Sequence, residues 1–102
     1  MTSDRVAIIG SNGQLGSDLS SQFKEGGNFT VIDLTHDDID VSKRQSVEVC
    51  LNEHSPDVVV NTAAVHDLKK CDNNPKKTFN VNAVGAKNIA EWCSSNNRLS
   101  VF

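Results

Sequence analysis

The 102-residue sequence has no tyrosine, one tryptophan and two prolines, and it has no apolar run long enough to cross a membrane. Its first residues carry no signal-peptide core. We therefore expect a cytoplasmic protein with no membrane partner. The missing tyrosine removes one of the side chains that enzymes use to transfer protons, which limits the chemistry that these residues can perform alone.

Basic charge and paired cysteines are scarce as well. Ten Lys and Arg residues are outnumbered by 13 Asp and Glu residues, so the net charge of −3 gives no reason to expect binding to nucleic acid. The three cysteines, Cys50, Cys71 and Cys93, include no C-x-x-C pair, so we predict neither a disulfide framework nor a metal site. We interpret Cys50 as a small core residue.

The most informative segment is rich in glycine. Residues 6–9 (VAII) are typical of a buried parallel strand, and residues 10–16 (GSNGQLG) follow directly. Three glycines would let the chain turn sharply, let a diphosphate approach the backbone, and let a helix pack closely. Amides at the helix start would bind the phosphates, although a purely structural turn is the alternative. The predicted coenzyme-binding residues here are Gly10, Asn12, Gly13, Gln14, Leu15 and Gly16.

Asp33 ends the next predicted strand, residues 29–33, and lies 20 residues beyond Gly13. At that distance a carboxylate can accept hydrogen bonds from the adenosine ribose of a dinucleotide. The same carboxylate would repel a 2′-phosphate, and no Arg or Lys occurs in the next nine residues to neutralise it. The sequence therefore predicts NAD or NADP as coenzyme, with NAD favoured. The alternative is that Asp33 is a solvated loop acid.

Hydrophobic spacing predicts the elements on either side of this strand. Leu15, Leu19 and Phe23 recur every four residues on a helix that would end at Gly26 and Gly27. A short edge strand is expected around residues 39–41. Residues 42–45 have the spacing of a capping box, which predicts a helix that begins near residue 43.

The rest of the chain continues the alternation of strand and helix. Residues 57–61 read as a buried strand, and a long helix is predicted from Pro75 with Asn74 as its N-cap. The predicted buried face of this helix comprises Phe79, Ala83, Ala86, Ala90 and Cys93. A further strand would begin at residue 98. The fold class is therefore α/β, a doubly wound Rossmann-like parallel sheet of about five strands in one domain, residues 1–102.

Two segments between these elements bear on function. Residues 61–64 (NTAA) are small and follow a strand, where they would leave room for a nucleotide, or alternatively would serve only for tight packing. Residues 65–74 carry His66 and Cys71, which do not have metal-ligand spacing. A solvated loop or short helix is favoured there over metal or acid–base chemistry.

Together these motifs resemble the dTDP-4-dehydrorhamnose reductase family of the extended short-chain dehydrogenase/reductases. The resemblance is carried by residues 10–16, 38–41 (DIDV), 56–64 (PDVVVNTAA) and 79–88 (FNVNAVGAKN). It implies a coenzyme site to which the residues after the glycine turn also contribute. By this resemblance the site adds Asp40 and Val41 near the adenine, Asn61, Ala63 and Ala64 near the ribose and nicotinamide, and Asn82 behind the active site.

The resemblance also implies a function. In that family a tyrosine protonates the sugar carbonyl and a lysine supports it, and this sequence has no tyrosine. We therefore expect an incomplete, NAD(P)-binding part of a reductase of 4-keto nucleotide sugars, with a nucleotide sugar as substrate of the complete protein. The alternatives are a non-catalytic subunit resembling the methionine adenosyltransferase β-subunit and a fragment of a nucleotide-sugar epimerase or dehydratase. An apolar strand near residue 100 also predicts self-association through the sheet edge.

Overall fold

The computed structural model describes residues 4–63 and 75–101, and for residues 75–81 it describes the backbone alone. Within these ranges strands and helices alternate, as in α/β proteins generally. The elements are β1 (Asp4–Ile9), α1 (Gln14–Gly26), β2 (Phe29–Leu34), α2 (Arg44–His54), β3 (Val58–Asn61), α4 (Pro75–Ser95) and β4 (Leu99–Val101). No helix in these ranges is long and apolar enough to span a membrane.

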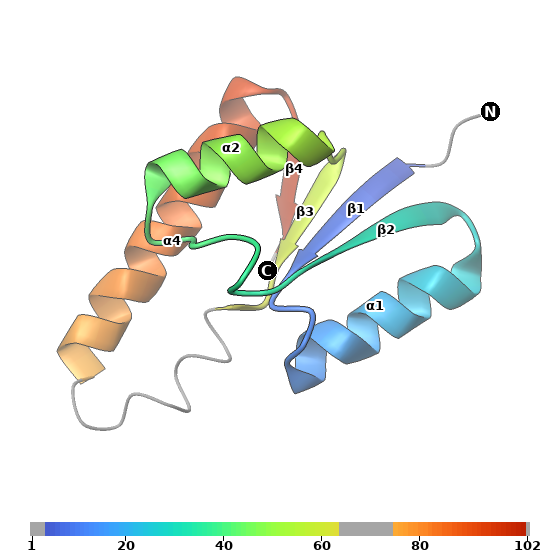
Figure 1. Cartoon of the computed structure of the whole chain (residues 1–102), viewed down its shortest axis with the longest axis horizontal. Coiled ribbons are helices and arrows are strands. Elements are labelled where there is room, and N and C mark those ends of the chain that lie inside the picture. Colours follow the sequence, from blue (N-terminus) through green and yellow to red (C-terminus); the bar gives the residue numbers. More distant parts are fainter. Residues whose placement is uncertain (1–3, 64–74, 102) are drawn as a thin grey trace.

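The four described strands form one parallel sheet in the order β2-β1-β3-β4. The chain therefore moves outward from β1 to β2 and then crosses back to build the other half of the sheet. Helix α1 lies on one face, and α2 and α4 lie on the other (Figure 1). This arrangement confirms the predicted doubly wound Rossmann-like fold, and it places the point where the strand order reverses between β1 and β3.

Alternation along β1 supplies both faces of the sheet with core residues. Val6 and Ile8 pack with Leu19 and Phe23 of α1. The opposite face holds the larger core, which comprises Ala7, Ile9, Leu34, Ile39, Val47, Cys50, Leu51, Val59, Ile89, Trp92 and Cys93. Cys50 is thus a core residue, as predicted. Because burying one such apolar side chain is worth about 1.5–3 kcal/mol, these two clusters fix the helices on the sheet.

Helix α1 follows the predicted pattern in its middle and at its end. Leu19 and Phe23 face the sheet, whereas Leu15 in the first turn is 47% exposed and does not join them. Gly27 adopts a left-handed φ of 72° and its N–H donates to the carbonyl oxygen of Lys24. The predicted glycine cap is therefore confirmed.

The prediction of an edge strand around residues 39–41 is wrong. The backbone there closes on itself, because the N–H groups of Asp38 and Ile39 both donate to the carbonyl oxygen of Thr35. These amides are consequently unavailable for a ladder beside β2. Ile39 is nevertheless 3% exposed, so the apolar residue that suggested a strand is a buried residue of a loop. The sheet therefore has four described strands.

Helix α2 begins at Arg44, close to the predicted start, but the predicted capping box does not form. The N-cap is Lys43, and no side chain caps it. The Ser42 hydroxyl instead donates to a carboxylate oxygen of Asp40, 2.6 Å away. Ser42 is therefore used by the preceding turn, since Asp40 competes for its hydroxyl group.

Helix α4 begins at Pro75 as predicted, but its buried face is different. Among residues 82–95 the buried ones are Gly85, Asn88, Ile89, Trp92 and Cys93. Cys93 is thus buried as predicted, whereas Ala83, Ala86 and Ala90 are exposed. Ile89 and Trp92 remove far more apolar surface from water than alanines would, so they decide the rotation of the helix. The side chain of Phe79 and the residue Asn74 lie outside the described residues.

Candidate functional site

The glycine turn connects β1 to α1 and is hydrogen-bonded to the end of β2. Gly10 has a left-handed φ of 84°, and its N–H donates to the carbonyl oxygen of Leu34, 2.8 Å away. The N–H of Ser11 donates to the same oxygen at 3.2 Å, and the N–H of Gly13 donates to the Gly10 carbonyl at 3.0 Å. The turn is therefore held by backbone hydrogen bonds to its own residues and to the end of β2.

Two of the three glycines are required by close contacts. A Cβ on Gly10 would lie 2.7 Å from Oγ1 of Thr62 and would also have to tolerate the positive φ. A Cβ on Gly16 would overlap the carbonyl oxygen of Gly10 and lie 2.9 Å from Cα of Ser11. Gly16 thus lets the first turn of α1 pack on the glycine turn itself. Gly10 and Gly16 are explained by sterics alone.

Gly13 has a different role. It is the N-cap of α1 with an extended backbone, φ −81° and ψ 171°, which any residue can adopt. It lies at the start of α1, where the sequence predicts that a diphosphate approaches the backbone.

Several amides at the start of α1 have no hydrogen-bond acceptor within the described part of the chain. The first helical bond runs from the N–H of Ser17 to the carbonyl oxygen of Gly13, 2.9 Å away. Among the described residues, none accepts a hydrogen bond from the N–H groups of Asn12, Gln14, Leu15 and Gly16. These amides and the positive end of the helix dipole fit a diphosphate without any basic side chain.

Thr62 ties the end of β3 to this turn, a role that sequence reasoning missed. Its N–H and its hydroxyl both donate to the carbonyl oxygen of Ile9, at 2.9 Å and 2.7 Å. Its neighbour Asn61 accepts a hydrogen bond from the N–H of Ala63 at 3.1 Å. The carboxyl ends of β1, β2 and β3 therefore meet, and they bring Gly10, Asn61 and Ala63 together. Ala64 lies outside the described residues.

Asp33 lies at the same end of the sheet but on the side of α1. Ser20 Oγ donates to one carboxylate oxygen at 2.6 Å, and Lys24 Nζ donates to the other at 2.7 Å. Partial burial raises the pKa of this carboxyl, but the hydrogen bonds and charge of its partners outweigh burial and hold the pKa below its usual range. Both donors precede Asp33 in the sequence, so a search of the residues after it could not find them.

The loop that carries Asp40 and Val41 is fixed to α4. Asp40 accepts hydrogen bonds from the N–H and the hydroxyl of Ser42, and the Ser42 hydroxyl is the main reason why the pKa of Asp40 is lowered. The carbonyl oxygen of Val41 accepts from Asn88 Nδ2 at 2.9 Å. Val41 and Ala63 pack against the same hydrophobic core, so this core holds both the loop after β2 and the end of β3 in place. Asn82 lies on α4, half-buried and less than one turn before Gly85.

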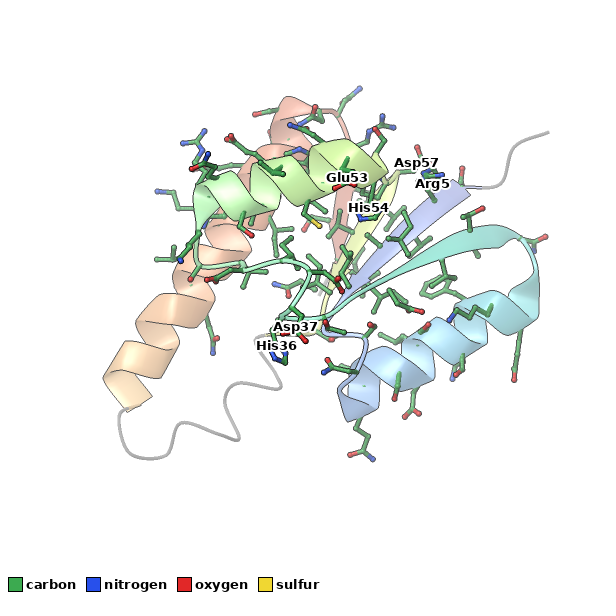
Figure 2. The ribbon with its side chains drawn as sticks, viewed as in Figure 1. Arg5, His36, Asp37, Glu53, His54 and Asp57 are labelled. Atoms are coloured by element: carbon green, nitrogen blue, oxygen red, sulfur yellow. The ribbon has the colours of Figure 1, made fainter. Side chains whose placement is uncertain are left out.

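Five of the residues labelled in Figure 2 lie at opposite ends of the strands. Figure 2 shows His36 and Asp37 in the loop after β2, near the glycine turn, and Arg5, His54 and Asp57 at the far end. At the far end, Asp57 accepts from the backbone N–H of Arg5 at 2.8 Å and from Arg98 at 2.8 Å. This second group ties strands together and lies away from the turn. Among the described residues, no group of three or more His, Cys, Asp and Glu residues could hold a metal ion.

The parallel sheet, the helices on both faces and the glycine turn at the switch point define a Rossmann-like α/β protein. The chain belongs to the family described as the RmlD substrate binding domain, whose model matches residues 4–102. This finding agrees with the resemblance on which the sequence-based expectation was built.

Named relatives and solved structures give the same result. The chain is 32% identical over 90 residues to the dTDP-4-keto-6-deoxy-D-glucose reductase of Streptomyces niveus, covering 88% of this chain and 31% of the relative. A dTDP-4-dehydrorhamnose reductase ortholog from Clostridium acetobutylicum is 34% identical, with a TM-score of 0.81 over 94% of this chain and 34% of that one.

A second solved structure supports the fold. The dTDP-4-dehydrorhamnose reductase of Bacillus anthracis, solved in complex with NADP, is 22% identical and has a TM-score of 0.87 over 100% of this chain and 36% of that one. The chain thus spans about a third of the length of each of these three proteins.

Proposed function

We propose that this chain binds a nicotinamide dinucleotide, specifically NADP, as the coenzyme-binding part of a reductase that acts on a 4-keto nucleotide sugar. The observation that carries the proposal is the row of amides at residues 12 and 14–16, which have no acceptor among the described residues and lie in a backbone-held turn at the switch point. A coenzyme bound there would supply the hydride. The chain's own residues would hold its diphosphate through backbone N–H groups.

The choice of NADP over NAD reverses the expectation from the sequence. That expectation assumed that no cation neutralises Asp33, whereas Lys24 forms an ion pair with it at 2.7 Å. The fold relative from Bacillus anthracis was solved in complex with NADP, and this supports the same choice. The preference for NAD therefore has no support.

Nucleotide-sugar reduction is proposed for the complete protein. The Streptomyces niveus relative is named as a reductase of dTDP-4-keto-6-deoxy-D-glucose, and the chain covers 31% of it. Because these 102 residues contain no tyrosine, we expect them to bind coenzyme without reducing a keto sugar. The regulatory-subunit and epimerase or dehydratase alternatives gain no support from the relatives reported above, which are named as reductases.

Calorimetric titration of the 102-residue chain with NADPH and NADH tests the proposal. The decisive variant is Gly13→Val, because its extended backbone accepts valine and the new side chain would block the diphosphate. The matched control is Gly26→Ala, since a Cβ on Gly26 meets nothing within 4 Å. We expect Gly13→Val to abolish binding and Gly26→Ala to preserve it, with both variants folded by circular dichroism. Equal binding by wild type and Gly13→Val would overturn the proposal.

A further inference from the structure

A cation from the preceding helix balances the negative charge of the Asp33 carboxylate. Ser20 and Lys24 lie four residues apart on α1, so both face β2, and each donates to a different oxygen of Asp33. The Lys24 ammonium and the carboxylate together carry no net charge. The predicted ribose acceptor therefore already has a hydrogen-bond donor on each of its two oxygens.

This pair changes how the site would respond to a 2′-phosphate. A bare carboxylate would repel a phosphate placed beside it, whereas an ammonium group attracts one and can donate hydrogen bonds to it. The Lys24 side chain is 56% exposed, and that of Asp33 is 38% exposed. The ammonium group is therefore open to solvent, and its flexible stem lets it contact a phosphate while staying near Asp33.

The other cations of the nearby elements have partners of their own. Lys43 lies 4.0 Å from Asp40, and Arg44 pairs with Glu48 at 3.0 Å. Among the side chains that the structure describes, those of residues 4–63 and 82–101, Lys24 is the one basic group that forms an ion pair with Asp33. The geometry thus singles out one lysine at the place where the sequence predicts the adenosine ribose.

We propose that Lys24 determines the selectivity for NADP over NAD, by cancelling the charge of Asp33 and by contacting the 2′-phosphate. The inference rests on the proposed coenzyme-binding function and extends it to a named side chain. Asp33 then acts mainly as the partner that positions Lys24. Ser20 anchors Asp33 to α1 without contributing charge.

A purely structural role for Lys24 makes a different prediction. If the ion pair only held α1 against β2, its loss would displace the glycine turn. The affinities for NADPH and NADH would then fall by the same factor. If Lys24 selects the coenzyme, its loss changes the ratio of the two dissociation constants. This ratio is therefore the measurement that separates the two roles.

The experiment titrates the 102-residue chain with NADPH and NADH by calorimetry, using Lys24→Gln, Lys24→Arg and the control Ser20→Ala. For Lys24→Gln we expect NADPH to bind about tenfold more weakly, the value of one hydrogen bond to a charged group, and NADH to change by less than about twofold. Lys24→Arg keeps the charge and should keep the wild-type ratio. Ser20→Ala removes the other hydrogen bond to Asp33 and should also keep the ratio.

A pair of fragments isolates the same contact. Adenosine 2′,5′-bisphosphate differs from AMP by the 2′-phosphate alone, so their affinities should differ in wild type and converge in Lys24→Gln. Failure of wild type to bind either coenzyme would overturn the proposed function and this inference with it. Binding of both coenzymes with an unchanged ratio in Lys24→Gln, or with equal losses for both, would overturn this inference and leave the proposed function intact.

Discussion

Asn88 on α4 donates a hydrogen bond through Nδ2 to the carbonyl oxygen of Val41, at 2.9 Å and across 47 residues of sequence. Asn88 is 8% exposed, so this bond lies in a region largely removed from water. A hydrogen bond in such a place has a high cost when one partner is removed, because the other is left unpaired. The loop after β2 is therefore held in position by a residue from the far half of the chain.

The first prediction concerns this bond. Asn88→Ala should lower the free energy of unfolding by about 1–3 kcal/mol, because the carbonyl of Val41 loses its partner in a partly buried site. Urea unfolding followed by circular dichroism measures the change. The matched control is Asn28→Ala at an exposed position, where we expect a change within about 0.5 kcal/mol. Equal stability of the Asn88 variant and wild type would contradict the role assigned to the bond.

A second contact between the same loop and helix gives the second prediction. A Cβ on Gly85 would lie 2.8 Å from Cγ2 of Val41 and 3.3 Å from its Cβ. Gly85→Ala should therefore cost about 1–3 kcal/mol of stability through overpacking, despite the better helix propensity of alanine.

The test of this contact is a double-mutant cycle. Val41→Ala removes the methyl group that the new Cβ would meet, so Gly85→Ala should be much less harmful in that background. In urea unfolding, the double variant should therefore lose less stability than the sum of the losses of the two single variants. Simple additivity would mean that the glycine is used for another reason.

The fold could be predicted from the sequence because its signals are local. The buried strands, the glycine turn and the cap at Gly27 each follow from a few neighbouring residues. The rotation of α4 could not be predicted in this way, since alanines and larger residues both recur at helical spacing. Only packing against the sheet shows that Ile89 and Trp92 are buried while Ala83 is exposed.

The site was predicted less completely, because its contacts join distant segments. Thr62 reaches the end of β1 across more than 50 residues, and a sequence pattern does not report such a bond. The partners of Asp33 were missed for a simpler reason. Lys24 lies nine residues before Asp33, whereas the cation that neutralises a 2′-phosphate was expected among the residues that follow. The spacing of Ser20 and Lys24 on one helical face was a signal that could have found them.

The third prediction follows from the pKa of Asp33. Its folded pKa lies below its unfolded value, so the unfolded state binds more protons through that range and stability rises with pH there. The contribution should be fully present above the ordinary aspartate pKa of about 4, and it should be lost as the pH falls through the folded value. In urea unfolding, the stability gap between wild type and Asp33→Asn should be constant near neutral pH and shrink in acid.

The cause of the shift can be tested in the same series. Lys24→Gln removes a hydrogen bond and a charge that both lower the pKa of Asp33. When Asp33→Asn is introduced into the Lys24→Gln background, the resulting loss of stability should be smaller and should vary less with pH. A loss that is unchanged by the absence of Lys24 would show that the ion pair does not stabilise the fold.

The last prediction concerns the outer edge of the sheet. In the described part of the chain β4 pairs with β3 alone, and Leu99 and Val101 are 60% and 42% exposed. They lie in register with Val58 and Val60, so all four side chains are on one face of the sheet. An unpaired apolar strand is a template for pairing with another chain, so we expect the 102-residue chain to self-associate.

Sedimentation at increasing protein concentration measures this association. Leu99→Lys should shift the equilibrium toward monomer by about tenfold or more, because a buried leucine is worth about 1.5–3 kcal/mol and a charge at an edge opposes pairing. The matched control is Val49→Lys, since Val49 is an apolar residue of α2 that is 61% exposed and lies away from the edge. If both variants reduced association equally, surface hydrophobicity in general would be responsible. If wild type stayed monomeric at high concentration, the edge would not drive association at all.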